Sequence, residues 1–128
     1  MIVVDTSAIM AIDLEASEAA SLVARLQSRQ TRLLPASAVL EATMVLARTH
    51  DDPKDALDRY MAKMTLTIVP IDETIVAAAQ EAFRRFGKGR HPAKLNLCDC
   101  FAYAVAKTFD APLLFVGNDF SQTDIRAA

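Results

Sequence analysis

The sequence predicts an α/β fold: a three-layer α/β/α sandwich around a central, mainly parallel sheet of four to five strands. Short runs of β-branched residues or leucine alternate along the chain with longer segments whose apolar residues recur at helical spacing. Strands that alternate with helices form parallel sheets covered on both faces, joined by right-handed crossovers. The 128 residues contain no repeat and no Pro/Gly/Ser-rich linker, so a single domain over 1–128 is expected.

The first half of the chain is expected to hold two strands and the helices that follow them. Residues 2–4, Ile-Val-Val, predict a buried strand, and the Asp-Thr-Ser after them favours a helix start. From Glu15 to Ser28 apolar residues recur every three to four positions, which indicates an amphipathic helix. Leu33-Leu34 predicts a second strand, and Ser37 opens a helix that reaches about Thr49.

The second half repeats this alternation of helix and strand. Its expected helices run from Asp52 to Met64, from Asp72 to Phe86 and from Asn96 to about Phe109. On the middle one, Ile75, Ala79, Phe83 and Phe86 are spaced to share one face, and Gly87 ends it. Its expected strands are residues 66–71, 113–116 and a short one near 124–126.

Composition excludes several classes of protein. The chain carries a net charge of −2, and 52% hydrophobic with 23% charged residues is too apolar for a disordered chain. Two cysteines do not make a disulfide scaffold. No apolar run approaches the roughly 20 residues that cross a bilayer, and Asp5 interrupts any signal peptide. We therefore expect a cytoplasmic protein without a membrane partner.

Four of the sixteen acidic residues stand apart from every other charge. Asp5, Glu41, Asp99 and Asp119 are each the only charged residue in a segment of at least a dozen residues. A carboxylate inside an apolar segment is costly unless it is hydrogen-bonded, paired or bound to a metal. These four are therefore the candidate functional residues.

Three of the four acids also have an ordinary structural explanation. Asp5 is well placed to cap the helix after the first strand. Asp99 lies three residues after Asn96, which is the spacing of a capping box. Asp119 follows a Gly-Asn pair that suits a turn. Glu41 has no such explanation, because it lies one turn inside a helix that is apolar nearly all round and is expected to be buried.

The topology predicts that the four acids meet. Asp5 ends the first strand and Asp119 follows the fourth, while the helices of Glu41 and Asp99 begin at the same edge of the sheet. Carboxylates gathered there repel one another unless a cation lies between them. Oxygen ligands favour Mg²⁺, for which Mn²⁺ can substitute, over zinc. The neighbouring polar residues expected to support this site by hydrogen bonds are Thr6, Ser7 and Asn118.

A basic segment leads into the Asp99 helix. With the four acids set aside, 12 acidic residues remain beside 14 basic ones, and five of the basic ones fall within 84–94. They are Arg84, Arg85, Lys88, Arg90 and Lys94. Bases at a helix C-terminus favour the helix dipole, which suffices for the first two. Those in the Gly-Lys-Gly-Arg loop are better explained by a phosphodiester substrate.

With these residues identified, the chain resembles the PIN-domain family, and more narrowly the VapC-type toxins of bacterial toxin–antitoxin pairs. The resemblance covers essentially the whole length. Its marks are IVVDTSAIMAI, SAVLEATMVLA, the FGKGRHPAKLNLCDCFAYAVA block and LLFVGNDFSQTDI. The third of these is the most specific.

The resemblance implies a Mg²⁺-dependent endoribonuclease that acts on tRNA, rRNA or mRNA. The family's four metal-site acids carry over to Asp5, Glu41, Asp99 and Asp119, with Asp124 as the alternative for the last. The resemblance also implies a VapB-type antitoxin that holds the enzyme inactive, and a homodimer. The alternative function is a catalytically lapsed PIN domain that only binds RNA or a partner.

Other acid-rich α/β proteins match less well. A receiver domain needs paired acids after the first strand and a lysine after the last, and a haloacid-dehalogenase-type phosphatase needs Asp-x-Asp; neither is present. Cys98 and Cys100 point to different sides of a helix and are interpreted as small buried hydrophobic residues. His50 and His91 are too few and too far apart in sequence for a histidine-based motif.

Overall fold

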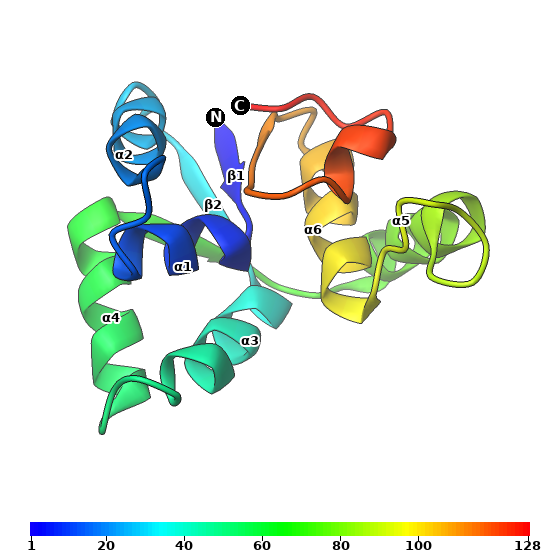
Figure 1. Ribbon diagram of the computed structural model, residues 1–128. Helices are drawn as coiled ribbons and strands as arrows, with labels where there is room; N and C mark the ends of the chain where they lie inside the picture. The colour runs from blue at the N-terminus through cyan, green and yellow to red at the C-terminus, as the bar shows by residue number, and fades with distance from the viewer.

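The computed structural model describes residues 1–128 and contains a four-stranded parallel sheet (Figure 1). The strands lie in the order β3-β2-β1-β4. They are β1 (Ile2–Val4), β2 (Arg32–Pro35), β3 (Leu66–Val69) and β4 (Leu113–Leu114). In the register, Val3 pairs with both Leu33 and Leu113, so β1 is a central strand.

The first four expected strands are confirmed, and the fifth is wrong. Residues 124–126 form no strand, and an isolated bridge joins Leu113 to Ala127 instead. The strand expected over 66–71 ends at Val69, because Pro70 has no N–H to donate to a neighbouring strand. The strand expected over 113–116 ends at Leu114.

All the expected helices are present, with shorter ends. They are α1 (Thr6–Asp13), α2 (Ala19–Gln27), α3 (Ala36–Leu46), α4 (Pro53–Met64), α5 (Glu73–Phe86) and α6 (Leu97–Thr108), followed by the 3₁₀ turn η1 (Phe120–Gln122). The helix expected from Glu15 begins later, because Glu15 adopts a left-handed backbone conformation with φ 53°. None of the helices is long and apolar enough to cross a membrane.

The helices cover both faces of the sheet, which confirms the three-layer arrangement. Ile2 and Val4 pack with the helices α1 to α4, while Val3 packs on the other side with α5 and α6. Side chains alternate between the faces of a strand, so three consecutive apolar residues serve two separate cores. Figure 1 shows the two groups of helices on either side of β1, with the two chain ends close together.

The expectation that the Glu41 helix is buried is wrong. One face of α3 packs on the sheet through Ala38, Ala42 and Leu46, but Leu40 and Met44 are 64% and 65% exposed. Phe83, expected on the buried face of α5, is 45% exposed. Apolar periodicity predicts which residues can be buried, but the packed neighbours decide which are.

Candidate active site

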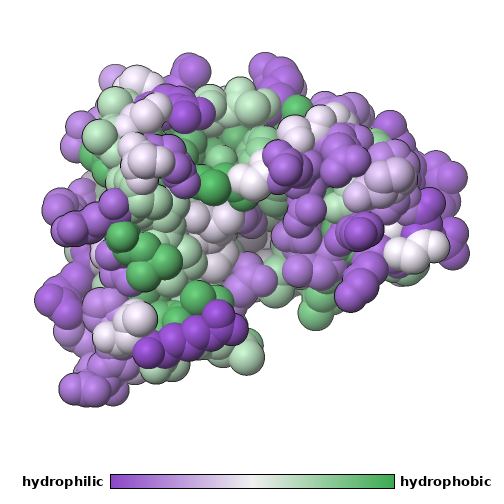
Figure 2. Space-filling view, in the orientation of Figure 1, coloured by the Kyte–Doolittle hydropathy of each residue, from purple (hydrophilic) through white to green (hydrophobic).

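The site lies where β1 ends, between α1, α3 and α6 (Figure 1). The middle of this face of the molecule is hollowed, as Figure 2 shows. Each of the four expected acids reaches this edge on a different element, as the topology predicted. The edge is the carboxyl end of a parallel sheet, where ligands bind in open α/β folds.

Asp5 caps α1 and is almost completely buried. Its carboxylate accepts hydrogen bonds from the Ser7 N–H (3.0 Å) and the Ser7 Oγ–H (2.5 Å). The Ser7 hydroxyl in turn accepts the Val116 N–H (3.0 Å), which ties the first helix to the loop after β4. The capping role expected of Asp5 is therefore confirmed, and Ser7 holds the carboxylate by two hydrogen bonds.

The surroundings of Asp5 oppose its charge. Burial raises the pKa of the Asp5 carboxyl, the hydrogen bonds from Ser7 partly offset this, and the negative charge of Glu41 raises it further. The next residue, Thr6, is 5% exposed, and its hydroxyl oxygen has no hydrogen-bond partner in the protein. A buried hydroxyl without a partner is uncommon and is expected to meet an ion or a water molecule.

Asp99 caps its own helix through a reciprocal pair of hydrogen bonds. Its carboxylate accepts the Asn96 N–H (3.0 Å), and the Asn96 side chain accepts the Asp99 N–H (2.9 Å), so the expected capping box is confirmed. Burial raises the pKa of Asp99 to about 6, and the charges of Asp5, Asp119 and Glu41 add to the rise. The carboxylate of Asp99 therefore interacts electrostatically with all three other acids.

Glu41 lies beside Cys98, which the sequence did not indicate. The two residues line the same hollow, and burial together with the charge of Glu41 raises the pKa of the Cys98 thiol to about 12. Cys98 is only half-buried, so its interpretation as a buried residue is wrong, whereas Cys100 is buried as expected. Glu41 on α3 and Cys98 on α6 are thus neighbours, and no local motif in the sequence pairs them.

Asp119 lies at the start of η1, is exposed and caps nothing. The adjacent Asn118 holds the turn through its carbonyl oxygen, which accepts the Ser121 hydroxyl (2.7 Å) and the Gln122 amide (3.3 Å). The side chain of Asn118 makes no hydrogen bond within the protein, so its expected support of the acids rests on the turn it forms.

Asp124 points to a different set of partners. It accepts the Tyr103 hydroxyl (2.7 Å) and the Lys107 ammonium (2.9 Å), and it pairs with Arg85 (3.5 Å). These partners hold the pKa of its carboxyl below the usual value, in spite of some burial. Asp124 is thus neutralised within the fold, while Asp119 contributes to the field at Asp99.

The four acids lie near enough for three of them to raise the pKa of Asp99, but they do not form a closed ligand set. No three Asp, Glu, His or Cys side chains lie close enough together to hold a metal ion as they stand. The donors are nevertheless all oxygen, two of them have raised pKa values, and the partnerless Thr6 hydroxyl lies beside Asp5. Such a donor set fits a hard divalent cation, which would relieve the repulsion among the carboxylates.

The five basic residues fall into two groups. Arg84 forms a two-pronged pair with Glu81, and Arg85 pairs with Asp124, so both are engaged within the protein. Lys88, Arg90 and Lys94 make no ion pair. The sequence already set Arg84 and Arg85 apart as bases at a helix C-terminus, and the structure identifies the carboxylate that pairs with each.

The three unpaired bases lie in a folded loop. Lys88 N–H donates to the Leu95 carbonyl and Leu95 N–H to the Phe86 carbonyl, both at 3.0 Å, so residues 87–95 form a closed loop at the end of α5. Gly87 permits the sharp exit from the helix, since a Cβ there would lie 2.5 Å from the Phe83 carbonyl oxygen. The loop surrounds a polar hollow of about 560 Å³.

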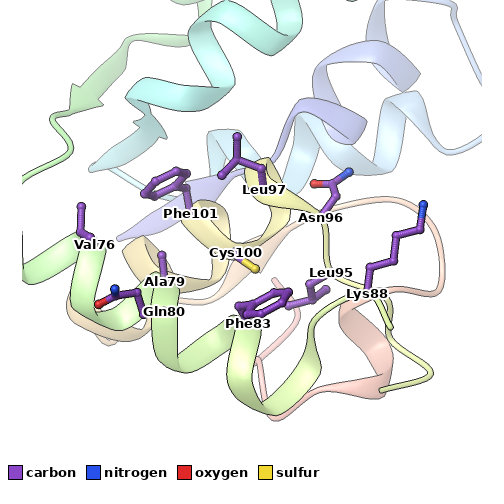
Figure 3. Close-up of a pocket in the computed structure, with 10 residues that line it drawn as sticks. All are labelled: Val76, Ala79, Gln80, Phe83, Lys88, Leu95, Asn96, Leu97, Cys100 and Phe101. Atoms are coloured by element: carbon purple, nitrogen blue, oxygen red, sulfur yellow. The ribbon is translucent and has the colours of Figure 1, made fainter. Parts of the chain in front are cut away.

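An apolar cleft lies between α5 and α6, next to this loop (Figure 3). It measures about 710 Å³, with Phe83, Leu97 and Phe101 among its walls and Lys88 at its rim. Leu97 and Phe101 also line a second hollow of about 690 Å³ that extends to Leu40 and Glu41 on α3. The two hollows make one continuous apolar surface beside the acids.

Comparison with known protein families shows that residues 2–126 match the PIN domain. The chain belongs to the PIN-domain family. Curated relatives within the family include Ribonuclease VapC of Mycolicibacterium smegmatis, 37% identical over 126 residues, which make up 98% of each chain. Ribonuclease VapC30 of Mycobacterium tuberculosis is 36% identical over 96% of this chain and 95% of its own. The chain is thus a VapC-type member of the PIN-domain family.

Solved structures of PIN-domain toxins share the fold at lower identity. Mycobacterium tuberculosis VapC20, a Sarcin-Ricin loop cleaving toxin, superposes with a TM-score of 0.75 at 14% identity and covers 100% of this chain and 98% of its own. VapBC2 from Rickettsia felis, solved with a promoter DNA fragment, gives a TM-score of 0.76 at 13% identity over 100% and 98%. These likenesses support the α/β fold of the family.

Proposed function

We propose that this PIN-domain protein is a Mg²⁺-dependent endoribonuclease toxin that hydrolyses RNA phosphodiester bonds at Asp5, Glu41, Asp99 and Asp119. The single observation that supports this most strongly is that four acids from different elements meet at the carboxyl edge of the sheet, where burial and the three other charges raise the pKa of Asp99 to about 6. Strongly perturbed carboxylates grouped in a hollow are typical of functional sites. Membership among the VapC ribonucleases points to the same chemistry.

The residues divide the work by their position. Asp5 and Asp99, both fixed by helix-capping hydrogen bonds, would be the principal metal ligands, and Glu41 and Asp119 would complete the acidic shell or orient the attacking water. When bound, Mg²⁺ lowers the pKa of a water molecule and neutralises charge on the reacting phosphate. Mn²⁺ would substitute, because it accepts the same oxygen ligands. Ser7 holds Asp5 in its orientation.

RNA would approach across the loop of residues 87–95. Lys88, Arg90 and Lys94 have no acidic partner in the protein and are free to contact phosphates. Arg84 and Arg85 would contribute less, because each already pairs with a carboxylate. The loop connects to Asn96, which caps the helix of Asp99, so a strand held by the loop lies beside the acids.

Two protein partners accompany this function. Toxin–antitoxin complexes are among the structural neighbours, including one from Klebsiella pneumoniae at a TM-score of 0.72 and 18% identity. We therefore include a VapB-type antitoxin that blocks the site, and a homodimer, in the proposal for a cytoplasmic enzyme. The exposed apolar residues Leu40, Met44 and Leu97 are a surface that such partners would cover.

A cleavage assay on a mixed pool of tRNA, rRNA and mRNA tests the proposal. The antitoxin-free protein is incubated with Mg²⁺ or with EDTA, beside Asp99→Asn and a matched control, Asp72→Asn. The carboxylate of Asp72, like that of Asp99, accepts a backbone N–H at the start of a helix, but Asp72 is the N-cap of α5 and lies outside the four acids. We expect discrete fragments with Mg²⁺ from the wild type and the control, and at least about 100-fold slower cleavage by Asp99→Asn.

The same assay separates the alternative function. Folded protein that binds RNA but cuts nothing in the pool at any Mg²⁺ concentration would contradict the proposal and favour a lapsed, binding-only PIN domain. Cleavage by Asp99→Asn at the wild-type rate would show that the acids do not carry the reaction. Both results are read against the retained fold of each variant, measured by circular dichroism.

A further inference from the structure

The loop that carries Asp119 is held at both ends. We call residues 115–126 the rim loop. Near its start the Val116 N–H donates to the Ser7 hydroxyl (3.0 Å), and near its end the Asp124 carboxylate accepts the Tyr103 hydroxyl (2.7 Å). Between these anchors Asp119 is exposed and its side chain forms no capping hydrogen bond. The position of Asp119 therefore depends on the two anchors.

The second anchor, the hydrogen bond from Tyr103 to Asp124, lies on the same helix as Asp99. Asp99 and Tyr103 lie one turn apart on α6 and so on the same side of that helix. Asp119 and Asp124 lie five residues apart on the rim loop. The two anchors come from the elements that carry two of the acids, because Ser7 also bonds Asp5 and Tyr103 lies one turn from Asp99. Like charges on Asp99 and Asp119 repel each other, and the hydrogen bond from Tyr103 to Asp124 holds the loop to α6 against that repulsion.

The surroundings of the hydrogen bond from Tyr103 to Asp124 stabilise it. Tyr103 is 3% exposed and packs against Phe86, so its hydroxyl is fixed in position. Lys107 (2.9 Å) and Arg85 (3.5 Å) add positive charge at the second oxygen of Asp124. Hydrogen bonds to charged groups are stronger than those between neutral groups. Three donors from α5 and α6 thus hold one residue of the rim loop.

We propose that Tyr103 and Asp124 are a positioning pair, which keeps Asp119 beside Asp99 and thereby sets the affinity of the four-acid site for divalent cations. This inference rests on the proposed metal-dependent function. Neither residue would touch the metal or the RNA. They act by fixing the position of the rim loop. Their effect is largest when no cation offsets the repulsion between Asp99 and Asp119.

Binding of Mn²⁺ alone tests the pair without RNA or cleavage. The free Mn²⁺ signal in electron paramagnetic resonance is followed for the wild type, Tyr103→Phe and Asp124→Asn. The matched control is Tyr60→Phe, because the Tyr60 hydroxyl also donates to a carboxylate at 2.7 Å, on Asp13, outside the rim. We expect the Mn²⁺ dissociation constant to rise about three- to tenfold in the two rim variants and to stay unchanged in the control.

A double-mutant cycle shows whether the pair acts through Asp119. Asp119→Asn should itself weaken Mn²⁺ binding, and Tyr103→Phe added to it should cause no further loss, because the residue being positioned no longer carries its charge. A general loss of stability would instead add to the effect of Asp119→Asn. Asp124 is 39% exposed, so we expect Asp124→Asn to retain the fold even where Tyr103→Phe disturbs packing.

The possible failures are distinguishable. Weaker Mn²⁺ binding in Asp119→Asn together with wild-type binding in Tyr103→Phe and Asp124→Asn would overturn the positioning role and leave the metal site standing. Additive losses in the double variant would overturn it as well. Absence of Mn²⁺ binding by the wild-type protein would overturn both the inference and the proposed function.

Discussion

Asp99 and Asn96 hydrogen-bond each other in both directions, side chain to backbone, at 3.0 and 2.9 Å. The same carboxylate that would bind metal therefore also stabilises the first turn of α6. Its two roles use different properties. The cap requires an acceptor oxygen, whereas the metal site requires a negative charge.

Asp99→Asn and Asp99→Ala should separate these two roles. The asparagine keeps an acceptor oxygen for the Asn96 N–H and removes a charge that burial opposes, so its free energy of unfolding should equal or exceed that of the wild type. The alanine loses the acceptor and should be less stable than the asparagine variant by about 1 kcal/mol. Urea denaturation in EDTA measures both, and equal stability of the two variants would contradict the capping role.

The stability of the metal-free protein should rise as the pH falls from about 7 towards 4. The pKa of Asp99 is raised to about 6 and that of Asp5 is also raised, so the folded state binds these protons more tightly than the unfolded chain. Proton uptake by the folded state therefore favours folding in this range. Below the usual pKa of an aspartate, protonation of Asp124 acts in the opposite direction, because its pKa is lowered in the fold.

Thermal unfolding in EDTA across this pH range measures the effect. Asp99→Asn should flatten the rise, since it removes the group with the pKa of about 6. Asp72→Asn serves as the control outside the site and should retain the rise. A wild-type stability that falls steadily from pH 7 to pH 5 would contradict the clustering of the acids.

The unpaired bases of the loop should contribute more to RNA binding than the paired ones. In an Asp99→Asn background, which removes cleavage, a triple alanine variant of Lys88, Arg90 and Lys94 should weaken binding. It should also reduce the slope of log K against log salt by about 2, at roughly 0.7 per phosphate contact for single strands. Arg84→Ala should change little, because Arg84 is engaged with Glu81. Equal effects of the two variants, by fluorescence anisotropy, would contradict this division.

Association of two copies should depend on the apolar surface beside the acids. Leu97 is 74% exposed and lies where the two hollows meet, so Leu97→Asp should raise the dimer dissociation constant at least about tenfold without unfolding the monomer. Leu14→Asp is the matched control, since Leu14 is 64% exposed at the end of α1 and lines neither hollow. Sedimentation analysis that finds the two variants equally dimeric would place the interface elsewhere.

Much of this architecture is readable in the sequence, because local signals are strong where the chain is regular. The run Ile2–Val4 and the caps at Asp52, Asp72 and Asn96 mark where elements begin. The ends are less certain, since they depend on single backbone features such as Pro70. The prediction of a fifth strand was wrong, because the last residues make one bridge to Leu113 rather than a ladder.

The exposed face of α3 shows what the sequence could not predict, namely which of its apolar residues are buried. Leu40 and Met44 are as apolar as Leu46, and the sequence alone cannot tell them apart. Only Leu46 meets the helices and the sheet beneath it, and the other two remain in solvent. Burial is a property of what packs against a residue, so it is settled by tertiary structure.

The sequence by itself determined which acids to suspect. Isolation within apolar segments singled out Asp5, Glu41, Asp99 and Asp119, and the rule for parallel sheets placed them at one edge. It could not distinguish Asp119 from Asp124, which lie five residues apart in one loop. Tertiary structure distinguishes their surroundings, because Tyr103, Lys107 and Arg85 come from helices 17 to 39 residues away and pair with Asp124 but not with Asp119. The role of a charge depends on its partners, and partners distant in sequence meet only in the fold.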